Sequence, residues 1–154
     1  MTKVMRQKVW AACGCAAVLA ASPLAAGQVS VGDVYLCHSD GNLPPVEVVV
    51  GKLETLGDVL SAEHVEADLA ETRLVHLQMR GVSQEPLPEV GHSPFQLSAL
   101  AMCEAVSSRH GAGLTGDFEG GYAMWKEAVV NDGAGFFTVN PAEAYWQMLG
   151  VIGQ

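Results

Sequence analysis

The spacing of apolar and polar residues predicts three β-strands in the first half of the chain. The run 34–37 is short, apolar and rich in strand-forming residues, and the turn-forming residues 39–42 follow it. β-Branched residues dominate 46–53, which predicts a second strand that pairs antiparallel with the first across this short connection. Regular alternation of apolar and polar residues predicts a third strand over 73–80.

The third strand is expected to present one face to the core and the other to water. Its apolar side carries Val75, Leu77 and Met79, and its polar side carries His76, Gln78 and Arg80. This pattern is typical of a half-buried antiparallel strand. We therefore expect His76 to lie at the solvent-facing surface of the sheet.

Three helices are predicted further along the chain. The sequence Ser-Pro-Phe-Gln at 93–96 has the order of a capping box with proline at the first helical position, and it predicts a helix over 94–108 with Cys103 on its inner side. Apolar residues at spacings of three and four predict a second helix over 122–129. Asn140 followed by proline predicts the start of a C-terminal helix.

Two further segments complete the expected fold. Phe136–Val139 is predicted as a fourth strand, and 58–71 is either a helix that begins at Asp58 or an acidic loop. Strands come first and helices later, so the predicted class is α+β. We expect a small, mostly antiparallel sheet of about four strands, with about three to four helices packed on one face.

The first 27 residues have the pattern of a cleaved secretory signal peptide. Three basic residues precede the apolar stretch 9–21, and small residues at 22–27 supply a cleavage site. The apolar stretch is shorter than the roughly 20 residues that a membrane anchor needs. Its two cysteines lie in its middle rather than at its end, which argues against a lipid attachment site. The sequence therefore predicts one exported domain over 28–154, periplasmic or secreted.

The distribution of charge along the chain indicates which kinds of partner the exported domain could bind. All 17 acidic residues follow the predicted leader, whereas three of the eight basic residues lie within it. The exported domain would carry five basic residues against 17 acidic ones, a formal net charge of −12. Such a surface repels nucleic acid and anionic lipid, and it favours a basic protein of the cell envelope, a cationic ligand or a divalent metal. Solubility alone would also account for this charge.

Cys37 and Cys103 are the two cysteines of the expected exported domain. In an oxidising compartment such a pair is first interpreted as a disulfide. The two residues are 66 positions apart, and closing a loop of that length would stabilise the fold by about 4 kcal/mol. Two buried thiols, or one reactive cysteine, are the alternatives.

Two patterns resemble catalytic or nucleotide-binding motifs but lack the required context. Residues 111–116 match the spacing of a dinucleotide-binding loop, yet they follow a predicted helix instead of a strand. Cys37 and His38 are neighbours on a predicted strand, so their side chains point to opposite faces and form no dyad. We therefore assign no catalytic residue and no cofactor.

The histidines do not define a metal site either. His38 and Asp40 could share a face and be completed by His92 or His110, but this spacing is common among proteins that bind no metal. No established metal-binding pattern accompanies them. The sequence thus predicts no metal ligand set.

Trp146 is the candidate anchor for a partner. It is adjacent to Tyr145 on the predicted C-terminal helix, so the two side chains diverge by about 100° and one should be less buried. The leading hypothesis is a non-enzymatic exported domain that binds another envelope or secreted protein. One alternative is a thiol-dependent hydrolase that uses Cys37 with a distant histidine, and another is a binder of a metal or a small cationic ligand.

Overall fold

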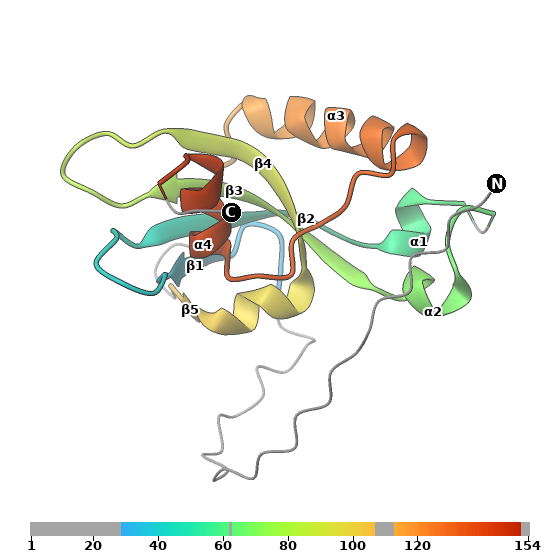
Figure 1. Ribbon diagram of the computed structural model, residues 1–154, viewed down its shortest axis with the longest axis horizontal. Helices are drawn as coiled ribbons and strands as arrows, with labels where there is room; N and C mark the ends of the chain where they lie inside the picture. The colour runs from blue at the N-terminus through green and yellow to red at the C-terminus, as the bar shows by residue number, and fades with distance from the viewer. Residues whose placement is uncertain (1–28, 62, 107–112, 152–154) are drawn as a thin grey trace, which may run out of the picture.

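The computed structural model describes residues 29–61, 63–106 and 113–151 (Figure 1). The predicted leader, 1–27, and the first two residues of the glycine-rich pattern at 111–116 lie outside them. The strands of the described residues are β1 (Val34–Cys37), β2 (Val46–Thr55), β3 (Arg73–Gly81), β4 (Glu89–Gln96) and β5 (Cys103–Ala105). Their helices are α1 (Leu56–Val59), α2 (Ala67–Ala70), α3 (Asp117–Asn131), α4 (Pro141–Met148) and the 3-10 helix η1 (Leu97–Met102).

The described strands form one antiparallel sheet in the order β4-β3-β2-β1-β5. The predicted α+β class with a small antiparallel sheet is therefore confirmed, and all three strands predicted in the first half of the chain are present. Within the described part of the chain the sheet has five strands, because β4 and β5 occupy part of the region expected to be helical.

One face of the sheet carries the main hydrophobic core, which α4 and η1 help to enclose. The strand residues of this core include Val48 and Val50 of β2, Leu77 and Met79 of β3, and Phe95 of β4. The C-terminal helix begins as predicted, because the Asn140 side chain accepts a hydrogen bond from the Ala142 N–H at 2.9 Å and Pro141 occupies the first turn. Tyr145 is completely buried and donates to the Pro88 carbonyl at 2.6 Å.

The opposite face of the sheet lies beneath α3, so the expectation that this side of β3 faces water is wrong for His76 and Gln78, whereas Arg80 is exposed as expected. The His76 side chain is 0% exposed, and Gln78 is also buried. Leu74, on the same face, joins Trp125 and Val129 of α3 in a second apolar cluster. Helix α3 covers these polar side chains, and their polar partners come from β2, β4 and Thr115, which alternation along one strand cannot reveal.

The helix predicted over 94–108 is also wrong: the described part of this region, 94–106, contains the end of β4, then η1 and β5. Residues 94–96 are strand and not helix because they pair with β3, where Val75 lies opposite Phe95 and His76 lies opposite Pro94. Proline is tolerated there because β4 is an edge strand, where a missing N–H breaks no ladder. Ser93 does not cap a helix, and its buried hydroxyl lies 3.8 Å from the Met148 sulfur.

The described residues of 58–71 take neither of the two forms considered, since the single-turn helices α1 and α2 are separated by residues without regular structure. Thr55, and not Asp58, caps α1: the Thr55 side chain accepts from the Asp58 N–H, and the Asp58 carboxylate accepts from the Thr55 N–H. These hydrogen bonds lower the pKa of Asp58. The strand predicted over 136–139 is wrong as well, because only Phe137 forms a bridge, to Phe95.

Candidate functional site

The structure joins Cys37 and Cys103 in a disulfide. The two residues lie directly opposite each other on β1 and β5, with their Cα atoms 4.4 Å apart. Cys103 therefore reaches Cys37 from an edge strand and not from the predicted helix. In this state Cys37 has no thiolate to act as a nucleophile, and His38 beside it is exposed.

Trp146 does not provide an exposed anchor, which corrects the expectation from sequence. Its side chain is 4% exposed, and its indole N–H donates to the Pro44 carbonyl at 3.2 Å. The ring packs edge-on against Tyr145, with the ring centroids 5.0 Å apart. Both aromatic residues face the main core because α4 is buried along most of its length. Trp125 on α3 is also buried.

The sequence did not predict a histidine cluster on the face of the sheet beneath α3, which consists of the buried His76 and the partly buried Glu54, His92 and Tyr122. His76 Nδ1 lies 2.8 Å from His92 Nε2, so the two rings share one hydrogen bond. His76 Nε2 lies 2.8 Å from Glu54 Oε1, but the ring N–H does not point along this contact and has no aligned acceptor. The Tyr122 hydroxyl lies 3.0 Å from each Glu54 carboxylate oxygen.

Helix α3 closes this cluster with aromatic rings. His76 packs edge-on against Tyr122 and Trp125, at centroid distances of 5.0 and 4.8 Å. Gly121 makes the close approach possible, because a Cβ at this position would lie only 2.6 Å from the Cβ of His92. The helix thus rests directly on the histidine pair.

Burial determines the protonation of the cluster. Desolvation, with the nearby His92 and Lys52, lowers the pKa of His76 to about 3. Desolvation alone lowers the pKa of His92 to about 4. Burial and the hydrogen bond to Glu54 raise the pKa of Tyr122 to about 12. Near neutral pH both imidazoles are therefore uncharged, and the cluster can take up protons only in acid or when α3 moves away.

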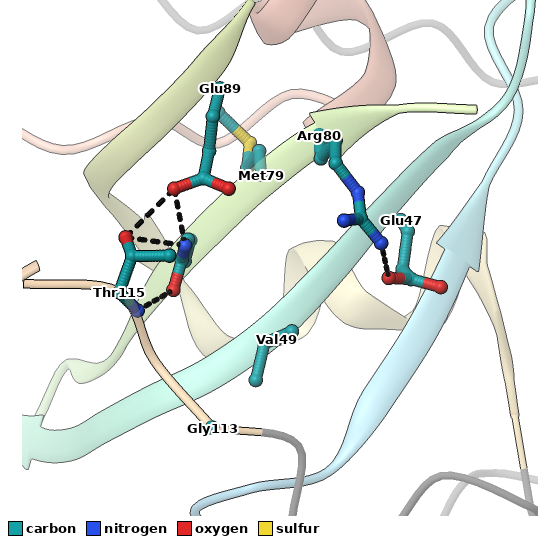
Figure 2. Close-up of a pocket in the computed structure, with 8 residues that line it drawn as sticks. Glu47, Val49, Met79, Arg80, Glu89, Gly113 and Thr115 are labelled. Carbon is teal, nitrogen blue, oxygen red and sulfur yellow. Dashed lines mark hydrogen bonds and ion pairs between the residues drawn. The ribbon is translucent and has the colours of Figure 1, made fainter. Parts of the chain in front are cut away.

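A second set of interacting polar side chains lies farther along the same face of the sheet. The Gln78 amide donates to Glu89 at 2.6 Å and accepts from the Thr115 N–H at 3.0 Å (Figure 2). Arg80 pairs with Glu47 at 2.8 Å on the neighbouring strands. A pocket of about 180 Å³ lies between these two sets. The polar side chains around this pocket form hydrogen bonds or an ion pair with one another.

A larger cleft, of about 350 Å³, separates α1 from the end of α3. The residues that line this α1–α3 cleft are Leu56, Leu60, His64, Val129, Val130, Gly133, Ala134, Gly135 and Phe136. Val130 is 45% exposed and is among the most exposed of the large apolar residues described. Trp125 supports one wall, because its indole N–H donates to the Gly135 carbonyl at 2.9 Å. The cleft is therefore a mostly apolar surface feature built on the second core cluster.

The described residues hold no group of three or more His, Cys, Asp and Glu side chains arranged for a metal ion. His92, considered with His38 and Asp40 for such a site, pairs with His76 instead. His110 lies outside the residues that the structure describes. Over the described ranges, no helix has the length and apolar character needed to cross a bilayer.

Comparisons of the chain with protein-family models, with curated proteins and with solved structures found no match. The function must therefore be argued from the geometry of the chain itself.

The histidine cluster and the α1–α3 cleft both depend on where α3 lies. A signal for this placement exists in the sequence, since Phe118, Tyr122, Trp125 and Val129 form an apolar stripe that needs a partner surface. The polar residues that α3 covers gave no such signal.

Proposed function

We propose that this protein is an exported domain that binds another protein through the α1–α3 cleft. The cleft is the observation on which this proposal rests. An exposed apolar recess beside a rigid sheet is the usual form of a surface that receives side chains from a partner. The signal-like leader and the Cys37–Cys103 disulfide support the exported location.

The export part of the proposal predicts a defined mass for the secreted protein. We expect the protein from the envelope or medium to begin near residue 28, and its mass to rise by about two hydrogens on reduction, as one disulfide requires. Mass spectrometry of the intact protein, with and without reductant, measures both. Recovery of the full-length chain from the cytoplasm, with both thiols free, would contradict export.

The proposed binding at the cleft predicts that a partner contacts Val130 specifically. A photo-crosslinking amino acid at Val130 should give one discrete adduct in the cells that make the protein, because this side chain lines the cleft. Val82 provides a matched control, since it is 44% exposed but lies in the loop between β3 and β4, at the other end of the molecule from α1 and α2 (Figure 1). The Val130 adduct should disappear when an excess of unmodified protein is added. Equal labelling at both positions, or none at either, would refute binding at the cleft.

A further inference from the structure

The α1–α3 cleft can seat only part of a partner. Its volume of about 350 Å³ is near the lower end of the range of about 300–1,000 Å³ for pockets that enclose a small ligand. Leu56 and Val129 form its buried floor, and Leu60 and Phe136 are half-buried at its sides. A short segment with one or two apolar side chains fits these dimensions better than a broad folded surface does.

The charges of segment 58–71, on the α1 side of the cleft, are of one sign, and the exposed Arg73 lies two residues beyond it. Segment 58–71 contributes two lining residues, Leu60 and His64, and contains no lysine or arginine. Its acidic residues, all exposed, are Asp58, Glu63, Glu66, Asp68 and Glu71. On the α3 side the exposed charged residues from 126 to 132 are Lys126, Glu127 and Asp132, which add one more net negative charge.

An acidic border around an apolar recess selects against acidic segments and attracts basic ones. Like charges brought together at an interface are costly, whereas opposite charges steer association and fix its register. The attraction acts over about 10 Å at moderate salt.

We propose that the occupant of the α1–α3 cleft is a polypeptide segment of the partner that combines apolar residues with lysine or arginine. Its apolar side chains enter the recess between Leu60 and Val130, and its basic side chains face the acidic segment 58–71. This inference rests on the proposed function, and it adds the chemistry of the partner.

The test uses two synthetic amphipathic peptides of equal length as probes, one of leucine and lysine and one of leucine and glutamate. Fluorescence anisotropy with the exported form of the protein should show binding of the lysine peptide, weakening as salt is raised. The glutamate peptide should bind at least about tenfold more weakly. Equal affinity for both peptides, or no binding of the lysine peptide, would overturn the inference.

Charge reversal on the protein locates the interaction. The variant Glu63→Lys/Glu66→Lys should bind the lysine peptide roughly tenfold more weakly and should gain affinity for the glutamate peptide. The control Asp40→Lys/Glu85→Lys makes the same change of net charge in exposed loops at the opposite end of the molecule (Figure 1). The gain for the glutamate peptide cannot come from misfolding. Equal effects of the two variants would show that net charge, and not the cleft, controls binding.

The two proposals fail in different ways. If crosslinking at Val130 captures a partner while the lysine peptide does not bind, the chemistry assigned to the partner is wrong and the binding function stands. If the peptide binds but crosslinking at Val130 in cells gives no adduct, the proposed function fails.

Discussion

Replacing Cys37 and Cys103 together with alanine should lower the free energy of unfolding by about 4 kcal/mol. The bond closes a loop between residues 66 positions apart, so its loss restores a large conformational freedom to the unfolded chain. Both sulfurs lie in the main core, and truncation to alanine adds a smaller cost of packing. Urea denaturation of the oxidised protein and of the double variant measures the difference.

This loss should also appear in the unmodified protein when the bond is reduced. A reductant should shift the urea midpoint of the unmodified protein toward that of the double variant and leave the variant unchanged. Two titratable thiols in the folded, unreduced exported protein would contradict the bond. The effect is large for a domain of this size, because net stabilities are only about 5–15 kcal/mol.

The sequence predicted β1, β2, β3 and the start of α4 correctly because each depends on local chemistry. Turn residues, alternation and the Asn140 cap act within a few positions of the elements that they define. The region 94–105 was wrongly predicted to be a helix because its structure depends on pairing with residues that are distant in the sequence. Val75 and His76 pair with it on one side, and Cys37 fixes Cys103 in register on another strand. Such pairings outweigh local helix signals.

The candidate sites depend even more on residues that are distant in the sequence, so local patterns reveal less of them. Alternation along β3 correctly separates its two faces, but it assigns His76 to water because histidine is polar. Only the placement of α3 reveals that His76 is covered, and only the pairing of β3 with β4 brings His92 to it. The cleft residues come from two segments about 70 positions apart in sequence, so no local pattern could indicate it. The disulfide could be predicted because the expected exported domain contains two cysteines, which allow a single pairing.

The protein should lose stability as the pH falls from 7 to 5, because it folds around two uncharged histidines. In the unfolded chain each histidine takes up a proton near its ordinary pKa of about 6.5, whereas His76 in the fold does so only at a pKa of about 3. The contribution of His76 to stability is therefore complete above pH 6.5 and decreases as the pH falls toward 3. By pH 5 the loss from His76 is about 2 kcal/mol. His92, with a pKa of about 4 but only partly buried, adds a smaller loss of the same sign.

The variant His76→Gln tests this directly, because glutamine can keep a hydrogen bond to His92 but does not titrate. Compared with the unmodified protein, it should be less stable at pH 7 but should lose about 2 kcal/mol less between pH 7 and pH 5. His38→Gln, which replaces an exposed histidine, is the control and should keep the full pH dependence. Glu54, 2.8 Å from His76 Nε2, opposes this shift because a carboxylate favours imidazolium. If Glu54 prevailed over burial, acidification would stabilise the protein and His76→Gln would abolish that gain, so the sign of the pH effect decides which interaction is stronger.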